Sequence, residues 1–216
     1  MLKIAVYDGG MGGALFADYL REELPIAKII PVIDRQNREK LIHHRLEARA
    51  TAERALQPYM GCVDLIVLAN HFLTATSLKH FERTYPGQKF VGFALPTPDT
   101  FVKRKTFVLT TSALARRLSF RYYVHTLRRD TTVLALDNLP AKIDQGRLGT
   151  EQLRKNIVQH TSAKPKEIIL ACSHFNDLKP ALREIYGQNL KFHDSSPATY
   201  REILRILKIR SYTKKK

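Results

Sequence analysis

The sequence predicts an α/β protein made of two pseudo-symmetric lobes, each built on a parallel sheet, with a cleft between them. Three observations lead to this expectation. Short apolar runs alternate with amphipathic stretches along the 216-residue chain, which is the pattern of repeated βα units. Two segments far apart in the chain read almost alike. Glycines cluster directly after the first apolar run, where a strand would turn into a helix.

The short apolar runs predict eight strands. Each run has four to six residues, which is the usual length of a buried strand. The expected strands are Lys3–Tyr7, Ile29–Ile33, Asp64–Ala69, Lys89–Phe93, Thr106–Thr110, Thr131–Leu136, Glu167–Ala171 and Leu190–His193.

The stretches between the strands predict helices. Arg38–Tyr59 is the clearest case, because its length and its content of Arg, Glu, Ala and Leu both favour a helix. The expected helices are Ala14–Glu23, Arg38–Tyr59, Thr76–Tyr85, Ala113–Arg128, Gly149–His160, Leu178–Tyr186 and Pro197–Lys208.

An internal repeat relates the two halves. Residues 65–72 (Leu-Ile-Val-Leu-Ala-Asn-His-Phe) match residues 168–175 (Ile-Ile-Leu-Ala-Cys-Ser-His-Phe) at an offset of 103. The same offset carries the first strand, Ile4–Val6, onto Phe107–Leu109. Two coincident offsets indicate a duplicated half. We expect one lobe to comprise residues 1–95 with 197–216 and the other residues 96–196, with the boundary near Pro96–Arg104.

The repeat also predicts a site. In open parallel sheets, ligands bind beyond the carboxyl ends of the strands, beside helix N-termini. If the two halves face each other, four such strand ends line one cleft. These ends are Asp8–Gly13, Ala69–Phe72, Thr110–Ala113 and Cys172–Asn176.

The net charge of +16 is concentrated in two stretches. Residues 101–130 hold eight basic side chains against one acidic, and the last sixteen residues hold seven against one. Such a field favours nucleic acids, other polyanions or anionic metabolites. A solvated, frayed tail is the simpler interpretation of Lys214–Lys216.

The sequence disfavours several classes of protein. No apolar run approaches the ~18 residues of a membrane span. The N-terminal apolar run is interrupted by Asp8, unlike a secretory signal. The two cysteines, Cys62 and Cys172, lack the spacing of a disulfide framework or a zinc site. We therefore expect a cytoplasmic protein without a metal centre.

The glycine-rich turn of residues 8–13 suits close backbone approach to an anion. It fits a nucleotide site poorly, because Leu15 stands where a dinucleotide motif needs a small residue and no Lys-Ser/Thr completes a phosphate loop. A ligand-free βα turn is the alternative. Burying Asp8 at a strand end is costly unless it is paired, which favours a functional role.

Cys172 follows an expected strand and precedes Ser173 and His174. A thiol near helix N–H groups and an imidazole would have an increased thiolate fraction. A lone cysteine at a strand end more often serves packing. The context here favours a reactive thiol.

These motifs resemble those of glutamate racemases, in the aspartate/glutamate racemase superfamily. Residues 7–13 look like the family's N-terminal aspartate–glycine motif, and residues 169–175 look like its second cysteine motif. Residues 68–71 occupy the place of the first cysteine motif, and the resemblance extends to residues 93–98 and 193–196. It implies two α/β halves, a small carboxylate substrate between them, and no cofactor.

The resemblance further implies that two cysteines exchange protons with opposite faces of the substrate α-carbon. Here the first cysteine corresponds to Ala69 and the second to Cys172. Cys62 is a poor substitute, being seven residues upstream of Ala69, about 23 Å along a strand. The chain departs from the family pattern at three more places. Gly9 stands where the family has a serine, and His71 where it has a threonine. Residues 39–41 stand where the family has a proline-tyrosine-glycine loop.

The favoured hypothesis is an isomerase-class enzyme that transfers a proton at the carbon next to a carboxylate, through one cysteine, as a divergent racemase, isomerase or decarboxylase. Cys172 would be the acid/base and His174 would tune it. Asp8 would orient the substrate. His71 would exchange the proton on the substrate face where the first cysteine is missing, because an imidazole titrates near neutrality. The alternative is a structural histidine.

Further residues at the strand ends are the expected contacts of the substrate. These substrate-binding candidates are Gly9, Gly10, Asn70, Thr111, Ser112 and Ser173. We also consider a homodimer as a candidate assembly.

The alternative is an inactive racemase homologue that binds an anionic metabolite or a nucleic acid. The helix Ala113–Arg128 would present Arg116, Arg117, Arg121 and Arg128, with Leu114, Leu118 and Val124 turned inward. Classical glutamate racemisation is the least favoured, because catalytic groups that act as a unit depend on one another.

Overall fold

The computed structural model describes residues 1–95, 105–127 and 130–209. Several sequence predictions lie outside these ranges: the boundary at Pro96–Arg104, the basic side chains of Arg128 and Arg129, and the tail Lys214–Lys216. The chain divides into two compact units. Unit 1 comprises residues 1–94 and the segment that begins at Ser196, and unit 2 comprises residues 95–195.

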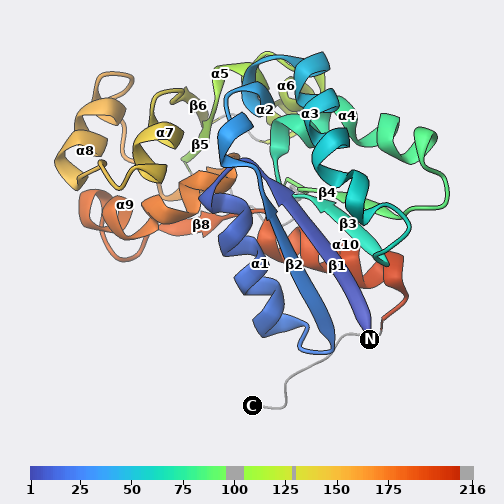
Figure 1. Cartoon of the computed structure of the whole chain (residues 1–216). Coiled ribbons are helices and arrows are strands. Elements are labelled where there is room, and N and C mark those ends of the chain that lie inside the picture. Colours follow the sequence, from blue (N-terminus) through green and yellow to red (C-terminus); the bar gives the residue numbers. More distant parts are fainter. Residues whose placement is uncertain (96–104, 128–129, 210–216) are drawn as a thin grey trace. The chain divides into compact units, whose positions relative to one another are not determined.

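Each unit contains a four-stranded parallel sheet (Figure 1). The sheet of unit 1 has the order β2-β1-β3-β4 and that of unit 2 the order β6-β5-β7-β8. The strands are β1 (Leu2–Asp8), β2 (Ala27–Ile33), β3 (Leu65–Leu68), β4 (Phe90–Gly92), β5 (Thr106–Thr110), β6 (Thr131–Ala135), β7 (Glu167–Leu170) and β8 (Lys191–His193). All eight predicted strands are confirmed.

The predicted repeat is confirmed at the level of strand register. Ile4 of β1 pairs with Leu65 of β3, and Phe107 of β5 pairs with Ile168 of β7. Both partners differ by the same 103 residues that relate the sequence motifs. The two sheets therefore share strand order and register, and the predicted α/β class with two similar halves is correct.

Helices flank each sheet. Those of unit 1 are α1 (Met11–Glu23), η1 (Arg35–Asn37), α2 (Lys40–His43), α3 (Arg45–Leu56), η2 (Gln57–Tyr59), α4 (His71–Thr84) and α10 (Ser196–Leu207). Those of unit 2 are α5 (Ser112–Ala115), α6 (Leu118–Thr126), α7 (Leu139–Asp144), α8 (Thr150–Val158), η4 (Ser173–Leu178) and α9 (Lys179–Tyr186). Within the described ranges, no helix combines the length and apolar character needed to cross a bilayer.

The prediction of one helix over Arg38–Tyr59 is wrong. The segment forms α2, α3 and η2, and His44 between the first two has an extended backbone with φ −119° and ψ 113°. Leu41 of α2 is buried, and a Cβ added to Gly9 would lie 3.0 Å from its Cδ1. Packing of α2 beside the glycine turn therefore overrides the helix propensity of the segment.

The prediction of one helix over Ala113–Arg128 is also wrong. The chain leaves helical geometry at Arg117, with φ −75° and ψ 133°, and separates α5 from α6. Leu114 is buried as expected, but Leu118 is 79% exposed rather than turned inward. Leu114 and Leu118 therefore do not share one continuous apolar underside, as was expected.

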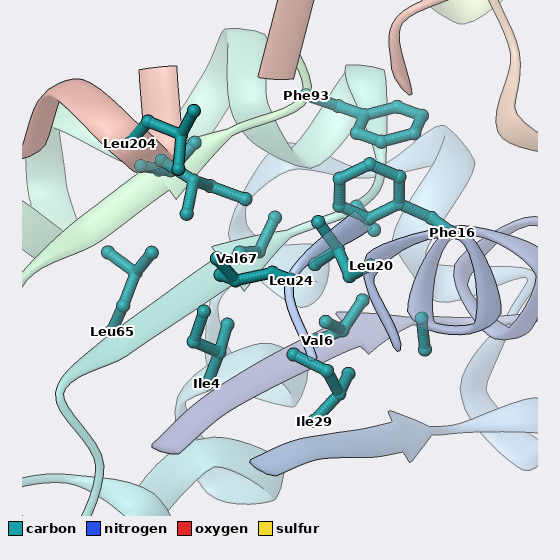
Figure 2. Packing of buried hydrophobic residues seen from close by; sticks show 14 residues of the cluster. Ile4, Val6, Phe16, Leu20, Leu24, Ile29, Leu65, Val67, Phe93 and Leu204 are labelled. Atoms are coloured by element: carbon teal, nitrogen blue, oxygen red, sulfur yellow. The ribbon is translucent and has the colours of Figure 1, made fainter. Parts of the chain in front are cut away.

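One core layer of unit 1 lies between one face of its sheet and the helices α1 and α10 (Figure 2). Strand residues alternate between the two faces of a sheet, so Ile4 and Val6 point to the same side. They meet the buried side chains of Phe16 and Leu20 from α1 and of Leu204 from α10. This packing fixes the position of α1 on the sheet, and with it the glycine turn that starts the helix.

Unit 2 has apolar layers on both faces of its sheet. On one face, strand residues such as Phe107 and Leu170 pack against Leu153 of α8 and Phe175 of η4. On the other face, Val108 and Ile169 pack against Leu114 and Phe120 of α5 and α6. The strand β7 is therefore buried on both sides, and its carboxyl end is held in place.

Candidate functional site

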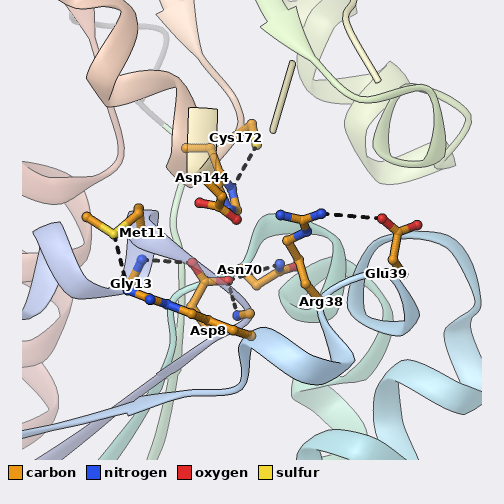
Figure 3. Close-up of polar contacts among 11 residues, drawn as sticks. Asp8, Met11, Gly13, Arg38, Glu39, Asn70, Asp144 and Cys172 are labelled. Atoms are coloured by element: carbon orange, nitrogen blue, oxygen red, sulfur yellow. Dashed lines mark hydrogen bonds and ion pairs between the residues drawn. The ribbon is translucent and has the colours of Figure 1, made fainter. Parts of the chain in front are cut away.

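Asp8, at the carboxyl end of β1, is fully buried and closely held by the protein (Figure 3). Its Oδ1 accepts hydrogen bonds from the Gly9 amide at 2.7 Å and from Asn70 Nδ2 at 3.3 Å. Its Oδ2 accepts from the Gly13 amide at 2.8 Å, in the first turn of α1. Amides at a helix N-terminus stabilise a carboxylate, which offsets the cost of burying it. Asp8 therefore ties the glycine turn, α1 and α4 together.

The glycine turn is packed too tightly for side chains at two positions. A Cβ at Gly13 would lie 2.3 Å from the Cβ of Asp8. A Cβ at Gly9 would lie 3.0 Å from the Arg38 Cα. Gly10, the N-cap residue of α1, is extended with φ −165°, so its backbone geometry does not require glycine. The turn is thus shaped by close approach of other parts of the protein. The Gly9 and Gly13 amides, which were expected to be free for an anion, donate to Asp8 instead.

Asn70 and His71 lie where β3 leads into α4. Asn70 is the N-cap of α4, and its side chain accepts a hydrogen bond from the Leu73 amide at 2.9 Å. His71 is buried, and its ring meets the ring of Phe93 edge to face with centroids 5.0 Å apart. Ala69 is fully buried. The predicted helix start at Thr76 is five residues late, because the N-cap role of Asn70 was not recognised.

Cys172, His174 and Asp144 form a thiol–imidazole–carboxylate chain in unit 2, called here the Cys172 chain. Cys172 follows β7 and is the N-cap residue of η4. Its Sγ lies 3.8 Å from His174 Nδ1 (Figure 3). His174 Nε2 lies 3.3 Å from Asp144 Oδ2, and both of these side chains are largely buried. Cys172 itself is partly exposed.

The curated relatives of this chain include glutamate racemases. The glutamate racemase of Pseudomonas syringae pv. tomato is 24% identical over 221 residues, covering 94% of this chain and 78% of that protein. No protein-family model matches the chain.

Solved structures show the same fold. Escherichia coli glutamate racemase, solved in complex with L-glutamate and the activator UDP-MurNAc-ala, superposes with a TM-score of 0.82 at 17% identity, covering 98% of this chain and 84% of that one. The chain therefore has the two-lobe α/β fold of glutamate racemases. Picrophilus torridus aspartate racemase is more distant, with a TM-score of 0.64 at 13% identity, covering 97% of this chain and 95% of that one.

Asp177 adds a second carboxylate near His174 in this racemase-like chain. Burial raises the pKa of Asp177, the charge of His174 lowers it, and the charge of Asp144 raises it again. The net direction is upward. Asp177 and Asp144 therefore both act electrostatically around one imidazole.

The raised pKa of Asp177 predicts a pH-dependent stability effect. The folded state holds the Asp177 proton more tightly than the unfolded state, so the ionised carboxylate costs stability at neutral pH. Asp177→Asn is expected to raise the free energy of unfolding at pH 7. The gain should disappear as the pH falls below the ordinary aspartate pKa of about 3.9. Urea titrations at pH 7 and pH 4, with Asp130→Asn as an exposed control, measure this. A gain that grew towards low pH would contradict it.

The remaining predicted residues lie at the strand ends as follows. Thr111 is buried at the N-cap of α5, and Ser173 is buried at the start of η4. The Ser112 amide donates to Asp137 Oδ1 at 2.6 Å, so that amide is already used within the protein. In the described part of the chain, no group of three or more His, Cys, Asp or Glu side chains could hold a metal ion.

Sequence reasoning missed Asp144 and the pair Tyr7 and Asp34. Asp144 lies in α7, a helix that was not predicted. The Tyr7 hydroxyl donates to Asp34 Oδ2 at 3.4 Å, and burial followed by the charge of Asp34 raises the pKa of Tyr7. Asp34 directly follows β2, so its place after a strand was the one available signal.

Proposed function

We propose that this chain catalyses cofactor-independent proton transfer at the carbon next to a carboxylate of a small amino or dicarboxylic acid. Cys172 is the single acid/base in this proposal. The observation that carries it is the Cys172 chain, which places an imidazole 3.8 Å from a partly exposed thiol at a strand end. An adjacent base held by a third group is the usual arrangement for activating a thiol.

The proposed steps follow from that geometry. His174 Nδ1 accepts the thiol proton, while Asp144 near Nε2 orients the ring and stabilises the imidazolium. The Cys172 thiolate then removes the proton on the carbon next to the carboxylate, and the electron pair of the C–H bond moves into that carboxylate as an enolate. The same thiol returns a proton to the carbon. No net oxidation or reduction occurs.

A single thiol is proposed because Ala69 carries no ionisable group at the place that resembles the first cysteine motif. His71 is the candidate for a second proton donor, but its burial against Phe93 favours a packing role. In the proposal, Asp8 and Asn70 stabilise the glycine turn, and the substrate-binding candidates remain Gly9, Gly10, Asn70, Thr111, Ser112 and Ser173.

The proposal is tested by solvent deuterium exchange. The protein is incubated in D₂O with a panel of amino and dicarboxylic acids, and loss of the proton next to the carboxylate is followed by NMR. The panel begins with both enantiomers of glutamate, because the Escherichia coli relative was solved with L-glutamate. We expect exchange with at least one member. Exchange with none would favour the alternative, a non-catalytic homologue that binds an anionic metabolite or a nucleic acid.

Asp144 is expected to act on catalysis by positioning His174. Asp144→Asn should lower kcat about 10²-fold, since it weakens general-base assistance to the thiol, and should change KM much less. It should also shift the pH profile of kcat, which loss of packing alone would not do. Asp130→Asn is the control, because Asp130 is exposed and lies outside the Cys172 chain and the substrate-binding candidates. Equal losses in the two variants would contradict the assignment.

A further inference from the structure

Unit 2 contains a cavity that the proposed chemistry does not use. Its volume is about 140 Å³, and it lies among α7, α8, η4 and α9. The walls are mainly apolar and are formed by Ile143, Leu148, Leu153, Leu178 and Ala181. Cys172, His174 and Asp144 are not among the residues that line it.

Asp177 is the one charged side chain among the lining residues of this cavity. It is exposed enough to meet solvent, yet burial still raises its pKa. A carboxylate at the rim of an apolar space provides one fixed hydrogen-bond acceptor and one negative charge. Polar anchors of this kind orient ligands in otherwise apolar pockets.

We propose that this cavity is a binding site for a small organic cation with an apolar body, such as a protonated aromatic amine of the benzylamine type. The inference goes beyond the proposed proton-transfer function and does not depend on it. The apolar body would occupy the space between Leu153 and Leu178, and the ammonium group would pair with Asp177.

The size of the cavity limits the occupant. A cavity of about 150 Å³ lined by Leu, Ile and Phe admits benzene. The present volume of about 140 Å³ therefore accepts one six-membered ring and is too small for a peptide helix.

Charge selects the sign of the ligand. The whole chain has a net charge of +16, so its long-range field repels cations. A cation that binds here must therefore do so through the local carboxylate. Asp144, whose charge raises the pKa of Asp177, adds to the local negative charge, whereas the charge of His174 opposes it.

The test is a titration of the complete chain with benzylamine at pH 7, followed by ¹H–¹⁵N NMR. Benzoate has similar size and opposite charge, and benzyl alcohol is the neutral analogue. We expect saturable shifts confined to residues 139–182 with benzylamine, weaker binding of benzyl alcohol and none of benzoate. Asp177→Asn should weaken benzylamine binding about fivefold and leave benzyl alcohol unchanged, as for a partly exposed ion pair.

A second variant tests the space rather than the charge. Ala181 is partly exposed on α9, so Ala181→Leu fills the cavity with little risk to folding. It should abolish binding of both benzylamine and benzyl alcohol. Equal binding of benzylamine and benzoate, an unchanged affinity in Asp177→Asn, or shifts mapping elsewhere would overturn the proposal. None of these readouts uses the racemase-like reaction, so the two proposals fail separately.

Discussion

Replacing Cys172 with alanine is expected to reduce deuterium exchange at least about 10³-fold, to the level of the uncatalysed reaction. The thiol is the group that takes and returns the proton in the proposal. The second cysteine, Cys62, belongs to unit 1 and precedes the amino end of β3, whereas Cys172 follows the carboxyl end of β7. Loss of a group that directly transfers the proton removes the whole acid/base contribution, which is worth about 10² to 10⁴ in rate.

The measurement compares wild type, Cys172→Ala and Cys62→Ala with the best substrate of the panel. Cys62 is exposed and makes the matched control, since it is the second cysteine of the chain. Circular dichroism verifies that each variant is folded. We expect Cys62→Ala to retain wild-type exchange. Exchange that persists in Cys172→Ala would remove the basis of the proposed mechanism.

Replacing Gly13 with alanine is expected to lower the free energy of unfolding by about 3 kcal/mol. The new Cβ would lie 2.3 Å from the Cβ of Asp8, which is fully buried and cannot move into solvent. Alanine improves helix propensity by about 1 kcal/mol, but this gain is smaller than the combined cost of overpacking and of a weakened bond to the Gly13 amide.

The Gly13→Ala effect is measured by urea denaturation, with Gly87→Ala as the control. A Cβ at Gly87 meets nothing within 4 Å, so that variant should change the free energy of unfolding by less than about 0.5 kcal/mol. Gly13→Ala should also lower activity if the glycine turn supports the site. Equal stability of the two variants would show that the turn accommodates a side chain, contrary to the packing around Asp8.

The strands were predictable because each is a short apolar run between breaks, and both faces of the central strands are buried. Ile66 and Ile169, for example, lie in strands whose every residue is buried. The repeat offset of 103 was readable because the two halves keep similar residues in strands that pair in the same register. Asp8 and Cys172 were identified for the same reason, since each follows such a strand.

The helix breaks and the third member of the Cys172 chain were not predictable from local patterns. The interruption at His44 depends on packing of Leu41 beside the glycine turn, which is a tertiary contact. Asp144 approaches His174 from a position 30 residues away in the chain, on a six-residue helix with little periodicity. The effect of the His174 and Asp144 charges on the pKa of Asp177 likewise becomes visible only in three dimensions.

The most direct test of the central claim is the configuration of the deuterium-labelled product. A chiral amino acid that exchanges is incubated in D₂O, and the labelled molecules are separated by enantiomer early in the reaction. A single thiol that removes and returns the proton on one face predicts label mainly in the starting enantiomer. Label appearing first in the opposite enantiomer, at the same rate in wild type and Cys172→Ala, would contradict the account.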